Sequence, residues 1–168
     1  LSSGFIEPLE STGIHLFQRA IIRLLVMFPP QGIKQSYVDE YNAQTKEEAE
    51  SIKDFIILHY HLTERKDTPF WRFCSSMDIP DSLKHRMDFF KESAQAYQEN
   101  LELFGEYSWV QVFMGQGLIP KEYHPIVDLL SDQELSNFLN TIKSGIEKKV
   151  QSWPDHNDFI KQYCPSSV

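Results

Sequence analysis

The chain is poor in cysteine, glycine and basic residues, and it lacks long apolar runs. Of its 168 residues, two are cysteine and seven are glycine. Cys74 and Cys164 lie far apart, and one such pair is no disulfide framework, which favours a reducing cytoplasmic location. No run reaches the roughly 18 apolar residues that a membrane span needs. The first ten residues have neither the basic start nor the apolar centre of a signal peptide.

The shortage of basic charge excludes several classes of partner. With 24 acidic and 16 basic residues the net charge is −8, which argues against binding nucleic acid or an anionic membrane surface. A small molecule or another protein region is the expected partner. The 41% hydrophobic content is enough for a folded core, and no Gly/Ser-rich linker divides the chain. We therefore expect one domain, or a piece of a larger one.

Apolar residues recur at helical spacing, and no segment alternates as a strand would. The chain is therefore predicted to be all-α. Predicted helices cover residues 8–28, about 33–64, a short turn from 69, a helix from 81, 107–115, 131–153 and 156–164. In the second helix, Thr45 and Glu48 suggest a capping box that restarts the helix after a polar interruption. A second capping box, Ser131 with Glu134, begins the helix whose apolar stripe we expect to face inward.

Other polar residues suggest structure more than chemistry. The acidic run at residues 45–50 is expected to be a solvated face. His59 and His61 stand two apart, which separates them on a helix and makes them packing residues more often than ligands. No histidine or cysteine has metal-ligand spacing, so no metal is predicted.

The stretch "GFIEPLESTGI", residues 4–14, is the most informative part of the sequence. A helix start presents free N–H groups and a partial positive charge, and so suits an anion. Small residues there allow close approach, and the Glu10 carboxylate beside them could position or deprotonate a substrate. The alternative is that the acidic and hydroxyl residues are simply helix caps.

Three segments carry a resemblance to a known family: "GFIEPLESTGIHL", "HYHLTERKDTPFWR" and "GQGLIPKEYHP". Together they resemble the C-terminal third of flavin-dependent halogenases, the tryptophan halogenase family. The resemblance implies the helical, substrate-side portion of a larger FAD-dependent, monooxygenase-like α/β enzyme. Residues 1–14 would be the active-site segment that joins the flavin-binding part, and residues 15–168 a helical substrate-binding subdomain.

The same resemblance implies a reaction and its residues. Reduced FAD, supplied by a separate flavin reductase, reacts with oxygen to a hydroperoxide that chloride or bromide attacks, giving hypohalous acid for an indole ring. Glu10 would be the catalytic glutamate. The implied halide ligands are the amides of Thr12 and Gly13, supported by Ser11. The residues implied to contact the flavin are Leu1 and Ile14.

The chain also departs from the family pattern. It lacks the glycine-rich dinucleotide motif, the catalytic lysine region and the W-x-W-x-I-P motif, so alone it should bind no FAD and be inactive. We expect it to be a segment of a longer enzyme, with a homodimer as one assembly. In the region that clamps free tryptophan only Leu103 and Phe104 match, and loosely. An indole without the amino-acid head, or a larger indole-bearing compound, is thus favoured over free tryptophan. A free-standing helical interaction module and a flavin monooxygenase without a halide step stay open as alternatives.

Overall fold

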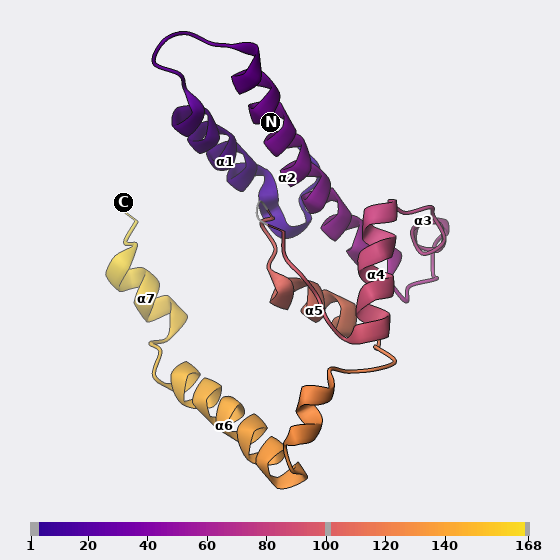
Figure 1. Ribbon diagram of the computed structural model, residues 1–168. Helices are drawn as coiled ribbons and strands as arrows, with labels where there is room; N and C mark the ends of the chain where they lie inside the picture. The colour runs from indigo at the N-terminus through magenta and orange to yellow at the C-terminus, as the bar shows by residue number, and fades with distance from the viewer. Residues whose placement is uncertain (1–3, 100–101, 167–168) are drawn as a thin grey trace. The chain divides into compact units, whose positions relative to one another are not determined.

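A computed structural model describes residues 4–99 and 102–166, which form two compact units divided after His124 (Figure 1). Every regular element within those residues is helical, as predicted. The first unit contains η1 (Leu9–Ser11), α1 (Thr12–Met27), α2 (Gln35–His61), α3 (Pro69–Cys74), α4 (Asp81–Ser93) and α5 (Glu106–Gly115). The second contains η2 (Pro125–Leu129), α6 (Asp132–Gln151) and α7 (His156–Tyr163).

Helices α1 and α2 form an antiparallel hairpin held by a buried ion-pair network. The Glu48 carboxylate, 2% exposed, accepts hydrogen bonds from Arg23 Nη2 and Arg19 Nε, both at 2.7 Å. Arg23 Nη1 also donates to Thr45 Oγ1 at 2.8 Å. The predicted restart of the helix at Thr45 is therefore wrong, because α2 runs through it unbroken and its polar stretch faces α1. The acidic run is likewise not wholly solvated, since Glu48 lies inside.

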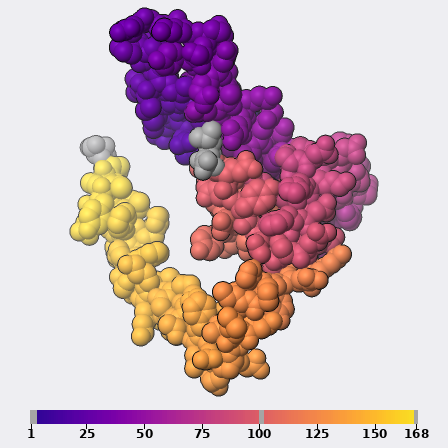
Figure 2. Space-filling view, in the orientation of Figure 1, coloured from indigo at the N-terminus to yellow at the C-terminus, as the bar shows by residue number. Residues whose placement is uncertain are grey.

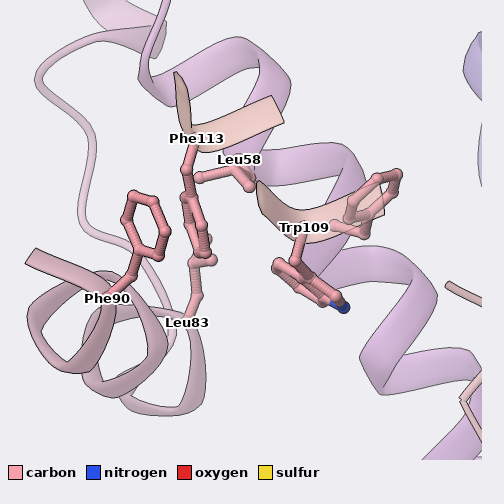
Figure 3. Packing of buried hydrophobic residues seen from close by; sticks show 6 residues of the cluster. Leu58, Leu83, Phe90, Trp109 and Phe113 are labelled. Carbon is pink, nitrogen blue, oxygen red and sulfur yellow. The ribbon is translucent and has the colours of Figure 1, made fainter. Parts of the chain in front are cut away.

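Aromatic side chains from three helices make the core of the first unit. Figure 3 shows Phe90 of α4 and Phe113 of α5 side by side, with Leu83, Leu58 and Trp109 around them. The rings of Phe90 and Phe113 stack with centroids 4.6 Å apart. Burial of such side chains contributes about 1.5–3 kcal/mol each. The C-terminal half of α2 is therefore anchored in the core, whereas its N-terminal half projects with α1 as a hairpin (Figure 2).

The predicted starts of α3 and α6 are confirmed. Thr68 Oγ1 accepts a hydrogen bond from the Trp71 N–H, and Pro69 takes the first helical position, where no N–H is needed. Ser131 and Glu134 form the predicted capping box.

The prediction of an inward apolar stripe on α6 is wrong for the second unit taken by itself. Leu135 of the predicted stripe is half-buried, but the other five side chains are 45–60% exposed, since no described layer of this unit covers them: Phe138, Leu139, Ile142, Ile146 and Val150.

Candidate active site

The backbone bends sharply just before α1, at two residues that are not glycine. Glu10 has φ 62° and Ser11 has φ 52°, both in the left-handed region. Such a conformation costs about 1–3 kcal/mol per residue and persists only where its surroundings enforce it. A 3-10 turn precedes the bend, with the Ser11 N–H donating to the Pro8 carbonyl at 3.0 Å. The α-helix therefore begins at Thr12, later than the predicted first turn at Pro8.

Ser11 stands at the N-cap position of α1, yet its side chain makes no capping hydrogen bond. This disagrees with the interpretation of the stretch as mere capping. Thr12 is 2% exposed and Gly13 is half-buried, so these two residues of the first turn of α1 are largely shielded from water. N–H groups of a first helical turn carry partial positive charge and lack partners further along the helix. The start of α1 thus keeps the character of an anion site.

Two consecutive residues at the C-terminal end of α2 hold the bend. The Tyr60 hydroxyl donates to Glu7 Oε2 at 2.7 Å. His59 Nε2 lies 3.5 Å from Glu10 Oε1, within ion-pair distance. Since Glu7 and Glu10 stand on either side of Pro8, α2 fixes the segment at two points.

The surroundings of Tyr60 make it a firm support. Its ring stacks on Trp71 of α3 with centroids 5.9 Å apart. The hydrogen bond to the Glu7 carboxylate, with burial added, raises the pKa of Tyr60 above its ordinary value of 10.0. The phenol therefore stays protonated, and able to donate this bond, across the physiological pH range.

His59 is itself held by α2. Its Nδ1 lies 2.8 Å from the Phe55 carbonyl oxygen of the preceding turn, and its ring meets the Phe55 ring edge-on at 4.9 Å. The prediction that His59 is a packing residue is therefore confirmed for the part of the imidazole that contacts Phe55. Its contact with Glu10 was missed, although both residues occur in segments that carry the family resemblance.

The predicted substrate residues connect to this site through Phe55. The Phe104 ring stacks on the Phe55 ring with centroids 3.9 Å apart. Contacts therefore run from Glu10 through His59 and Phe55 to Phe104, which joins two parts of the predicted site that lie far apart in sequence. Leu103 is half-buried beside it.

The remaining predicted site residues differ in how far the structure describes them. Ile14, in the first turn of α1, is 73% exposed and offers an apolar surface. Leu1 lies outside the described residues. Within the described ranges, no group of three or more His, Cys, Asp or Glu side chains is placed so that it could hold a metal ion, and no helix is both long and apolar enough to cross a membrane.

A separate groove lies between α2, α4 and the segment after α4, with a volume of about 670 Å³. Its lining is rich in carboxylates, namely Glu47, Glu50, Asp54, Asp81, Glu99 and Glu102. Burial raises the pKa of Asp54 above its ordinary value. None of the predicted active-site residues Glu10, Thr12 and Gly13 lines this groove.

Comparison with known proteins identifies the class. The family model for tryptophan halogenase matches residues 1–132, and the chain belongs to this family. A relative from Kutzneria sp. (strain 744), the 7-chloro-L-tryptophan 6-halogenase KtzR, is 34% identical over 95% of this chain and 32% of its own length.

Solved structures agree with this assignment. Xcc4156, a flavin-dependent halogenase from Xanthomonas campestris, is 51% identical with a TM-score of 0.94, over 98% of this chain and 33% of its own. BrvH, a flavin-dependent halogenase from Brevundimonas sp. BAL3, is 38% identical with a TM-score of 0.88, over 95% of this chain and 32% of its own. The chain thus spans about a third of the length of these relatives, and the resemblance seen in the sequence is confirmed.

Proposed function

We propose that the chain is the helical, substrate-side part of an FAD-dependent halogenase that chlorinates or brominates an indole-type aromatic compound. The observation that carries this proposal is the left-handed bend at Glu10 and Ser11. It places a partly exposed carboxylate directly before an uncapped helix start. A carboxylate beside an anion site is what a reaction between a halide-derived oxidant and a neutral ring requires.

The start of α1 has the properties that the halide and flavin roles need. We propose that the Thr12 and Gly13 amides bind chloride or bromide, with Ser11 in support. The exposed apolar side chain of Ile14 suits contact with the flat flavin ring, a role that we extend to Leu1. The bound flavin, reduced by a separate reductase, would activate oxygen, and oxygen would be the oxidant that converts halide to hypohalous acid.

Glu10 is proposed to direct the transfer to the ring. Its carboxylate can accept a hydrogen bond from the O–H of hypohalous acid and hold the halogen toward the arene. The halogen–oxygen bond breaks as the carbon–halogen bond forms, and the ring then loses its proton. Hydroxide released from the acid and this proton together make water, with the carboxylate as the local proton acceptor.

The structure favours an indole without an amino-acid head as substrate. Glu102, a carboxylate in the region that would clamp free tryptophan, is already ion-paired with Arg86 and bonded to Ser51. Its second oxygen accepts a hydrogen bond from the Glu99 N–H, and its side chain is only 4% exposed, so little of this carboxylate is open to a substrate ammonium group. Some relatives are named for tryptophan, and KtzR for a chlorinated tryptophan. This chain is proposed to differ from them.

The test uses the complete polypeptide with FAD, a flavin reductase, NADH, oxygen and either bromide or chloride. Product analysis should show halogenated indole in preference to halogenated free tryptophan. Glu10→Gln should abolish arene halogenation while flavin oxidation continues at the wild-type rate. Glu47→Gln, at an exposed carboxylate of α2, is the matched control and should change neither rate. Full product formation by Glu10→Gln would exclude the proposed role of Glu10.

A further inference from the structure

We propose that His59 is a positioning residue that fixes the orientation of the Glu10 carboxylate. This inference rests on the proposed function and deepens it. The contact of His59 Nε2 with Glu10 Oε1, at 3.5 Å, joins the end of α2 to the active-site bend. Nothing in the composition or spacing of the sequence assigns this role to His59.

Glu10 needs an external support because its own chain cannot orient it. A glutamate side chain has three rotatable bonds, and that of Glu10 is 38% exposed. Freezing such a side chain in one conformation costs conformational entropy. A support that holds one oxygen removes much of this freedom before the substrate arrives. In the described residues, no hydrogen bond from another side chain reaches Oε2 of Glu10, which is therefore left for the reacting groups.

His59 is suited to this task because its other nitrogen is already anchored. A carbonyl oxygen only accepts hydrogen bonds, so the contact of Nδ1 with the Phe55 carbonyl means that Nδ1 carries a proton. The edge-on contact with the Phe55 ring fixes the plane of the imidazole. With one nitrogen and the ring plane fixed, Nε2 can point only toward Glu10. It attracts the carboxylate when it is itself protonated, or when the Glu10 carboxyl group carries the proton.

The groups facing His59 come from two elements. From the active-site segment, Glu10 faces it directly, whereas Glu7 Oε2 accepts the hydrogen bond from the neighbouring Tyr60. From α2 itself, the Phe55 carbonyl faces Nδ1. At 3.5 Å the contact with Glu10 is longer than an ordinary hydrogen bond. Such contacts at catalytic carboxylates often tighten when the substrate is bound.

Two substitutions at His59 separate positioning from packing. In His59→Gln the amide nitrogen reaches where Nε2 lies and can donate to Glu10, but the anchor to Phe55 is lost. In His59→Asn the shorter amide keeps the nitrogen near Nδ1, bonded to Phe55, and does not reach Glu10. If His59 positions Glu10, the asparagine variant is the defective one. If it only packs against α2, the glutamine variant is.

The experiment measures arene halogenation by the complete polypeptide, together with its flavin oxidation and its crystal structure. His59→Asn should lower kcat by about 10- to 100-fold, comparable to the loss from a misplaced catalytic group, with the KM for the indole unchanged. The kcat of His59→Gln should stay within about threefold of the wild-type kcat, because the glutamine amide still holds the Glu10 carboxylate. Flavin oxidation should be equal in all three proteins.

The crystal structures keep the inference testable if no arene is halogenated. The Glu10 carboxylate should keep its wild-type position in His59→Gln and leave it in His59→Asn. A wild-type protein that halogenates no indole would refute the proposed function but not the inference. An unchanged Glu10 in the His59→Asn structure, or wild-type kcat in that variant, would overturn the inference.

Discussion

The buried network between α1 and α2 leads to a prediction whose size follows from the structure. Arg19 and Arg23 donate to the same carboxylate, Glu48, each at 2.7 Å. Their surroundings differ, since the Arg23 side chain is 6% exposed and that of Arg19 is 39% exposed. Methionine at either position keeps an apolar stem of similar length and removes one guanidinium. Arg23→Met and Arg19→Met therefore make the same chemical change at a buried and at a half-exposed position, and the difference between their effects measures the contribution of burial.

The expected costs differ because water screens only one of the two ion pairs. Removing one partner of a buried ion pair costs about 3–5 kcal/mol where the other charge stays buried, and Arg23→Met leaves the buried Glu48 carboxylate with only the half-exposed Arg19 as a charged partner. Exposed pairs contribute only about 0.2–1 kcal/mol. With about 1.4 kcal/mol per factor of ten, Arg23→Met should loosen the hairpin at least about a hundredfold. Arg19→Met should loosen it by less than about tenfold, by the same conversion.

Amide hydrogen exchange of α1 in the complete polypeptide measures this loosening directly. Exchange of residues 12–27 reports the opening of the hairpin and leaves the rest of the fold as an internal reference. The double variant Arg23→Met with Glu48→Met should recover much of the loss, because an apolar pair replaces a buried carboxylate that has lost its buried partner and keeps only the half-exposed Arg19. Equal effects of the two arginine variants, or a double variant worse than Arg23→Met alone, would refute the reasoning.

Three further predictions concern the site and its supports. Gly13→Ala should raise the halide KM at least about tenfold if the amide binds halide. The melting temperature should not change, because the added Cβ meets only the Phe5 ring at 3.9 Å. An unchanged halide KM would exclude this halide-binding site. Tyr60→Phe removes the donor to Glu7 and should destabilise the protein by about 1–3 kcal/mol in denaturant titrations, and an unchanged free energy of unfolding would contradict this supporting role. Asp54→Asn should stabilise the protein at neutral pH, because burial raises the pKa of Asp54 and the ionised form penalises the folded state. That gain should fade as the pH falls through the raised pKa toward the ordinary value of 3.8, and a gain independent of pH would contradict this origin.

The position of the hairpin network matters for the proposed chemistry. Helix α1 begins at Thr12, whereas the supports His59 and Tyr60 lie on α2. The distance between the proposed halide-binding amides at the start of α1 and His59, which contacts Glu10, therefore depends on how α1 packs against α2. Loosening the hairpin should disturb the site even though Arg23 and Glu48 take no part in the reaction.

Helical periodicity and local caps were predictable from the sequence because they depend on neighbours within one turn. The capping box at Ser131 and the Thr68–Pro69 start need only three or four consecutive residues. The polar stretch around Thr45 and Glu48 led to a wrong prediction for the opposite reason. Polar residues within a helix predict solvent contact unless a partner lies across from them, and Arg23 stands on another helix.

The sequence by itself determined that the chain is helical and that it belongs with the tryptophan halogenases, and it predicted residues 10–13 as the site of the chemistry. Helical spacing, helix caps and the Pro-Leu-Glu-Ser-Thr-Gly block depend on residues that are close together in the sequence, and so they can be recognised without the structure. Only the tertiary structure decided that Glu10 and Ser11 adopt the left-handed bend and that His59 faces Glu10 from α2, 49 positions along the chain. The bend is costly for these residue types, and contacts from α2 hold it in place.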